Sequence, residues 1–162
     1  MASVINALDT ITSVLNNATY LTDPYPTARD FWWHDTPPDP RLTFPRGYIY
    51  LVSDSQEKLN IGRPYCSKHT VMIGIRLFTK GEGMMATAFT EGAIVYKSDR
   101  FLLLYLDKVD KALANAMRDV LIPAGYFNYM TVRMGEPRQY EPTQGWTGEL
   151  QIRLTFYTGM GV

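Results

Sequence analysis

Two stretches of strict alternation constrain the fold of this chain more than any other feature of its sequence. In residues 70–79 and 149–157, every second position is apolar: Val71, Ile73, Ile75 and Leu77 in the first stretch, and Leu150, Ile152, Leu154 and Phe156 in the second. Successive side chains of a strand point to opposite faces of its sheet. Each stretch therefore predicts a strand with one face on a core and the other mixed or in water.

Two further segments have the spacing of helices. Apolar side chains three or four residues apart predict helices over residues 4–15 and from Ser98 or Asp99 to Leu121. The first stripe is Val4, Leu8, Ile11 and Leu15, and the second is Val109, Leu113, Ala116, Met117 and Val120. Ser3 is a suitable N-cap for the first helix, and Pro123 with Gly125 ends the second.

Two more strands complete the predicted elements. Residues 47–54 are rich in β-branched and aromatic side chains, and residues 129–134 carry a weaker strand pattern. We expect the strand at 47–54 to pair antiparallel with the strand at 70–79, across a polar turn region at 55–64. Residues 135–148 contain two prolines and predict a projecting loop.

The order of these elements predicts an α+β fold. The chain has 162 residues, the size of one ordinary domain, and no break in composition divides it. We expect a single domain over residues 1–162, with an antiparallel sheet of about four strands and helices packed on one face.

Two segments fall outside this regular pattern. Residues 22–45 contain six prolines together with Phe31, Trp32 and Trp33, which predicts an extended arm or ordered loop. Its aromatic side chains must pack on their own domain or on a neighbouring subunit. Residues 80–92 have three glycines around an apolar middle and are typical of a mobile loop or hairpin.

Side chains for catalysis or metal binding are scarce. Only His34 and His69 could act as imidazole bases, and Cys66 with His69 supplies two ligands where structural zinc requires four. Asp107 and Asp110 are expected to face water beside neighbouring lysines. We therefore expect no catalytic, cofactor or metal residues, and predict that the protein is not an enzyme.

The charge and the cysteine content limit the classes of partner and the cellular environment that we expect for this chain. Lys plus Arg and Asp plus Glu number 16 each, so the basic excess typical of proteins that grip phosphate backbones is missing. Tyr48 and Tyr50 could stack bases, but the basic residues expected around them are missing. A single cysteine suits a reducing cytoplasm, and no apolar run approaches the roughly 20 residues that span a bilayer.

The segments YIYLVSD, HTVMIGIRLFT, DKVDKALANAMRDVLI and WTGELQIRLTFYT, in this order after a short first helix, resemble the tail-terminator (tail-completion) proteins of long-tailed bacteriophages. The resemblance lies in pattern and size. It implies a structural virion protein, assembled in the host cytoplasm, that forms a homo-hexameric ring. The ring would cap the tail tube and bind the tube protein and the head-neck connector proteins, while DNA passes through its lumen without specific binding.

A ring joined head to tail needs two different, complementary patches on every copy. The candidate contact residues are aromatic or methionine side chains in the arm, the glycine-bounded loop and the last connection: Phe31, Trp32, Trp33, Met84, Met85, Phe89 and Trp146. Two alternatives stay open. The chain could be another phage neck or tail-tube component, or a monomeric ligand-binding or adaptor module whose aromatic arm lines a pocket.

Overall fold

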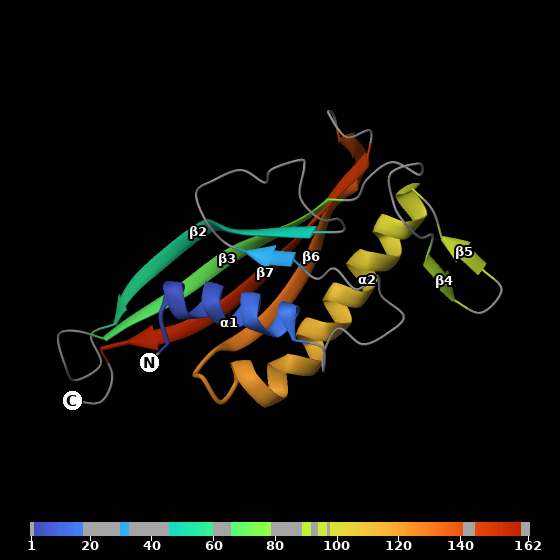
Figure 1. Cartoon of the computed structure of the whole chain (residues 1–162). Helices are drawn as coiled ribbons and strands as arrows, with labels where there is room; N and C mark the ends of the chain where they lie inside the picture. Colours follow the sequence, from blue (N-terminus) through green and yellow to red (C-terminus); the bar gives the residue numbers. More distant parts are fainter. Residues whose placement is uncertain are drawn as a thin grey trace.

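Four long antiparallel strands form the body of the fold in the computed structural model (Figure 1). The structure describes residues 2–17, 30–32, 46–59, 66–78, 89–91, 94–96, 98–140 and 145–159. In chain order, the elements are α1 (Val4–Asn16), β1 (Asp30–Trp32), β2 (Arg46–Leu59), β3 (Cys66–Phe78), β4 (Phe89–Glu91), β5 (Ile94–Tyr96), α2 (Ser98–Ala116), β6 (Phe127–Tyr140) and β7 (Gly145–Thr158). The main sheet has the order β1-β2-β3-β7-β6. The predicted α+β class and antiparallel sheet are confirmed.

The apolar residues of the two alternating stretches form the side of the core that the sheet contributes. All four apolar residues of the 70–79 stretch are buried, and so are the four of the 149–157 stretch. Strand pairing aligns them in rows, for example Ile49 opposite Ile75 and Ile75 opposite Leu150. Chain order places β6 before β7, yet β7 lies between β3 and β6, which leaves β6 at one edge of the sheet.

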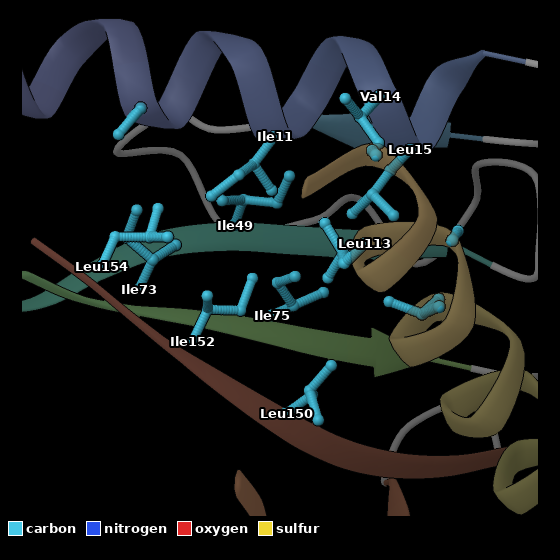
Figure 2. Packing of buried hydrophobic residues seen from close by; sticks show 14 of the residues in the cluster. Ile11, Val14, Leu15, Ile49, Ile73, Ile75, Leu113, Leu150, Ile152 and Leu154 are labelled. Atoms are coloured by element: carbon cyan, nitrogen blue, oxygen red, sulfur yellow. The ribbon is translucent and has the colours of Figure 1, made fainter. Parts of the chain in front are cut away.

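Both helices cover the same face of the sheet (Figure 2). The Ser3 hydroxyl accepts a hydrogen bond from the Asn6 amide at 3.0 Å and caps α1, as predicted. Helix α1 lies towards β1 and β2, whereas α2 lies over β7 and β6. At Gly148 of β7 a β-carbon would stand 3.1 Å from Leu106 Cδ1, so the glycine lets α2 approach the sheet closely.

The second helix ends as the sequence predicts, but through a different local geometry. Its last turn, Met117–Leu121, is a π turn, in which the Ile122 amide donates to the Met117 carbonyl at 2.9 Å. Gly125 then adopts a φ of 94°, a conformation that favours glycine after a helix. The turn leads directly into β6. Just before this strand, the Tyr126 hydroxyl donates to the Ser3 carbonyl at 2.8 Å and connects the start of α1 to this corner.

Short strands lie in the two irregular segments. Within the predicted arm, β1 pairs parallel with the start of β2, with Asp30 opposite Arg46 and Trp32 opposite Tyr48. The rest of the arm lies outside the described residues. In the glycine-bounded region, β4 and β5 form a separate antiparallel hairpin beside α2 (Figure 1).

Two of the predicted connections are wrong. Residues 55–59, assigned to a polar turn, continue β2, and they pair with residues 66–70 of β3. Residues 135–140 and 145–148, assigned to a projecting loop, extend β6 and β7, with a register shift between Met134 and Arg138. These extensions carry polar side chains, glycine and proline, so no alternation marks them, and only pairing with a neighbouring strand reveals them as strands.

The two helix carboxylates also differ from expectation. Asp107 forms an ion pair with Arg133 of β6, and Asp110 accepts a hydrogen bond from the Thr131 hydroxyl at 2.9 Å. Both therefore connect α2 to the sheet instead of facing only water. Helical spacing identified their shared side of the helix, but it did not reveal that β6 lies beneath that side.

Candidate assembly surface

The two faces of the sheet have different surroundings. One face lies under α1 and α2, and the other, here called the open face, carries no described helix. The open face of the two central strands holds Arg76 and Glu149, whereas the opposite face of the same strands holds the buried aliphatic rows. Any surface available to a partner on the sheet therefore lies on the open face or along the sheet edges.

A polar and aromatic cluster occupies the centre of the open face. The Tyr50 ring crosses β3 above Gly74, and its hydroxyl donates to a carboxylate oxygen of Glu149 on β7. Arg76 donates to the other carboxylate oxygen through Nε at 3.3 Å and Nη2 at 3.1 Å. The Gln151 amide donates to the first oxygen at 3.0 Å. Hydrogen bonds therefore link three adjacent strands through a single carboxylate.

Aromatic contacts extend this cluster towards β1. The Arg76 guanidinium lies 5.4 Å from the centre of the Tyr50 ring, within the range of a cation–π contact. Tyr48 stacks on Tyr50 with 5.7 Å between ring centres. Tyr50 therefore has a ring contact on one side and a guanidinium contact on the other, within a polar centre on the open face.

The protonation of the cluster follows from its contacts. Burial, followed by the hydrogen bond to Glu149, raises the pKa of Tyr50 to about 12. Burial alone would raise the pKa of Glu149, but hydrogen bonds from Tyr50, Gln151 and Arg76 outweigh it and lower that pKa. At neutral pH, Glu149 is therefore an anion held by neutral and cationic donors. With its oxygens already bonded to protein groups, the carboxylate is suited to fixing the sheet more than to acid–base chemistry.

An apolar stripe follows the open face of the edge strand β6. Met130, Val132 and Met134 are 40%, 41% and 45% exposed, and they alternate with residues that face the helices. Arg153 on β7 lies beside the stripe, with its guanidinium 3.8 Å from the Met130 sulfur. We call Met130, Val132 and Met134 the β6 stripe. The β6 stripe therefore places exposed apolar side chains on an edge strand of the sheet.

The opposite edge of the sheet is only partly covered by β1. Pairing with β1 ends at Tyr48, and from there β2 continues to Leu59 with no described strand on its outer side. Leu51 and Val52, each 42% exposed, mark the point where the register against β3 shifts. We call residues 51–59 the distal half of β2. The described sheet therefore has two uncovered edge segments of different composition.

A second polar cluster closes one end of the core. His69 lies flat on Phe156, with 4.8 Å between ring centres, and its Nδ1 is 3.1 Å from Asp54 Oδ1. Its Nε2 is 3.2 Å from the Thr158 hydroxyl. Because a carboxylate only accepts hydrogen bonds, Nδ1 carries the hydrogen and, in the neutral ring, Nε2 accepts from Thr158.

This carboxylate–imidazole–hydroxyl order matches that of hydrolytic triads, and the sequence did not reveal it, because the three residues come from β2, β3 and β7. One ring face and both nitrogens of His69 are occupied by protein groups, and its side chain is only 13% exposed. The arrangement satisfies a polar ring at the end of the core. Cys66 lies three residues before His69 on the same strand, so the two side chains point to opposite faces and share no ligand.

The structure places some of the predicted contact residues. Phe31 and Trp32 belong to β1, and Phe89 begins β4. Trp146 lies on β7, partly buried against the core. Trp33, Met84 and Met85 lie outside the described residues. The described candidates thus come from three separate strands, and Trp146 contacts its own domain.

The β6 stripe was missed by sequence reasoning, although its signal is visible. Met130, Val132 and Met134 occupy every second position of the predicted strand, but alternation alone does not say which face of a sheet is covered. Only the position of α2 over the other face of β6 shows that this apolar set is exposed.

The described residues contain no cluster of three or more His, Cys, Asp or Glu side chains placed to hold a metal. Within the part of the chain that the structure describes, neither helix has the length and apolar character needed to cross a membrane. No known protein family matches the chain, and no curated protein does.

Proposed function

We propose that this chain is a structural virion protein, a phage tail terminator whose copies form a hexameric ring on the end of the tail tube. The ring caps the tube, stops the addition of further tube subunits and joins the tube to the head-neck connector proteins. The proposal begins from the resemblance of the sequence to tail terminators, and the exposed edge of the sheet supports it.

The observation that carries the proposal is the β6 edge. β6 is 14 residues long, lies outermost in the described sheet and bears three exposed apolar side chains on its open face. An edge strand presents unpaired backbone donors and acceptors, and monomeric proteins usually protect such edges with lysines, prolines or bulges. β6 has a register shift near each end and carries Pro137, but the five residues between the shifts, Met-Thr-Val-Arg-Met, contain no bulge, lysine or proline. Such an edge suits assembly.

The charge of the chain suits the lumen of a tail. DNA must pass through the ring without being held, and a basic surface would hold it through its phosphates. The formal net charge of zero fits free passage. On the open face, Arg76 is neutralised by Glu149 at 3.1 Å, which removes one cation from those available to DNA.

The test of this proposal is the mass and shape of the purified full-length chain. Native mass spectrometry and light scattering over a range of concentrations should show a hexamer, and negative-stain images should show rings with a central opening. Added to purified tail tubes, the protein should bind at tube ends and stop their elongation.

Three other outcomes would contradict the proposal. Monomers at every concentration, with or without tubes, would favour the ligand-binding or adaptor module. Stacked rings that grow into tubes would favour a tube component instead. Rings that do not bind tube ends would favour another neck protein.

A further inference from the structure

We infer that neighbouring copies of this chain join edge to edge, with β6 of one copy pairing antiparallel with the distal half of β2 of the next. This inference rests on the proposed function, because it names the contact that builds the ring. It makes the main sheets of successive copies one continuous sheet, with all open faces on the same side.

The first support is strand direction. β2 is antiparallel to β3, β3 to β7 and β7 to β6, so β6 runs opposite to β2. When a second copy is placed beside β6 in the same orientation, its β2 is the next strand and runs antiparallel to β6. Head-to-tail addition thus produces the antiparallel ladder that the rest of the sheet already uses, without turning any copy over.

The second support is the chemistry of the two edges. Each has exposed apolar side chains, with Leu51 and Val52 on β2 and the β6 stripe on the other edge. Leu51 is opposite the buried Ile73 and lies on the helix-covered side of the sheet, whereas the β6 stripe lies on the open face. Joining the edges pairs their backbone groups and places a neighbouring strand beside each apolar set, one on each face of the joined sheet. Pairing with β1 ends where Trp32 lies opposite Tyr48, and within the described part of the chain no strand pairs with the outer side of β2 beyond that point.

The third support is charge. The distal half of β2 carries the acidic residues Asp54 and Glu57 beside Lys58. The β6 strand carries Arg133, Glu136 and Arg138, and Arg153 lies next to it on β7. Arg133 already has Asp107 as a partner and Asp54 already contacts His69, whereas the described polar contact of Arg153 is the neutral Met130 sulfur. The pairing therefore brings a more acidic edge next to a more basic one. This favours contacts between β2 and β6 over contacts between two β2 edges or two β6 edges.

This pairing also explains why a ring forms in place of a dimer. An edge that paired with its own copy would give a two-fold dimer with no free edge of that kind. Because β6 and β2 are different surfaces, every joined pair keeps one free β6 and one free β2. Addition continues until the first and last copies meet.

Two single substitutions test the inference on the full chain. Val132→Glu places an acidic group in the β6 stripe, opposite the acidic edge, and Leu51→Lys places a cation opposite the arginines. Both side chains are more than 40% exposed, so both variants should fold; circular dichroism and melting temperature check this. Val52→Lys replaces Leu51→Lys if the latter unfolds. Ile5→Lys and Ile122→Glu, at residues 60% and 55% exposed and outside the sheet, are the matched controls.

The decisive measurement is the mass of each variant and of their mixture. Each edge variant alone should be monomeric, while both controls should assemble like the original chain. Mixing Val132→Glu with Leu51→Lys should give a one-to-one dimer and nothing larger, because the intact β2 of the first pairs with the intact β6 of the second. The two edges that stay unpaired in this dimer are the β6 edge with Val132→Glu and the β2 edge with Leu51→Lys, and neither can add another copy.

Other results overturn the inference in distinguishable ways. If the original chain forms rings and both edge variants still do so, the edge contact is wrong while the proposed function stands. If Leu51→Lys dimerises alone, β6 pairs with itself. If two monomeric variants give no dimer on mixing, the two edges do not meet. An original chain that stays monomeric with and without tubes overturns the proposed function and this contact together.

Discussion

The Tyr50 ring lies across Gly74 so closely that a β-carbon on Gly74 would stand 2.4 Å from Tyr50 Cζ. Tyr50 and Gly74 are directly paired residues on β2 and β3. Because Gly74 has no side chain, the Tyr50 hydroxyl reaches over β3 and meets Glu149 on β7. A missing side chain at one position thus allows a contact that connects three strands.

Substituting Gly74 should therefore show strong coupling to Tyr50. Gly74→Ala should lower the free energy of unfolding by about 1–3 kcal/mol, because the ring must move and its hydrogen bond to Glu149 is lost. In a Tyr50→Ala background the same substitution should cost little, since the space is then empty and alanine is at least as good as glycine in a strand. Denaturant unfolding of the four proteins of this cycle measures the coupling. Equal costs in both backgrounds would contradict the close approach.

The Tyr50 hydroxyl should lose its proton at a higher pH than an ordinary tyrosine. Its pKa in the folded chain is raised from 10.0 to about 12, so the neutral phenol is the form that folding favours. This contribution to stability is complete below pH 10.0 and is lost as the pH rises through about 12. Ultraviolet absorbance of the phenolate, compared between the original chain and Tyr50→Phe, isolates the titration. Glu149→Gln should move it to lower pH, and an unchanged titration would show that the carboxylate does not act on Tyr50.

Glu149 should stabilise the fold in the opposite part of the pH range. Its folded pKa lies below its ordinary value, so its contribution is present above the pKa of the unfolded chain, about 4, and is lost as the pH falls through the lower folded value. The original chain should therefore be more stable than Glu149→Gln at neutral pH, and this difference should shrink in acid. Thermal melting at several pH values measures it. A difference that is constant with pH would show that the charge of Glu149 is not involved.

Removing the hydroxyl of Tyr129 should make the protein more stable. This hydroxyl is buried without a hydrogen-bond partner among the described residues, and burial, followed by Asp110, raises its pKa. Tyr129→Phe keeps the ring and removes the unpaired group, which should raise the free energy of unfolding by about 1 kcal/mol. Tyr126→Phe is the control, since the Tyr126 hydroxyl donates to Ser3 and its loss should be destabilising. A loss of stability in Tyr129→Phe would reveal a partner for that hydroxyl.

Trp146 should act mainly within its own domain. It packs against the core, so Trp146→Ala should lower the free energy of unfolding by about 2 kcal/mol. The folded fraction of this variant should still assemble, in contrast to Val132→Glu, which should fold and remain monomeric. Melting temperature together with native mass separates the two effects. If Trp146→Ala keeps full stability but no longer assembles, Trp146 lies in the interface between copies.

Local patterns in the sequence determined the elements and the core. The period-two apolar residues from Val71 to Leu77 and from Leu150 to Phe156 are all buried in the structure. The helical stripes that include Ile11 and Leu113 are buried as well, except for Val4, Met117 and Val120, which are partly buried against the same core. Such patterns are reliable because each reflects one buried face, and a buried face must repeat with the period of its own backbone. Ser3 as a cap belongs to the same class, since it depends only on the residues that follow it.

Relations between distant segments were decided by the tertiary structure. The polar ends of β2 and β6 are strands only because a neighbouring strand satisfies their backbone, and no side-chain period marks them. The face of β6 that stays exposed depends on where α2 lies, and the contact of Tyr50 with Glu149 depends on the strand order β2-β3-β7. The type and spacing of residues indicate which side chains must be buried or hydrogen-bonded. Packing between elements decides which other residues or partners bury or bond them.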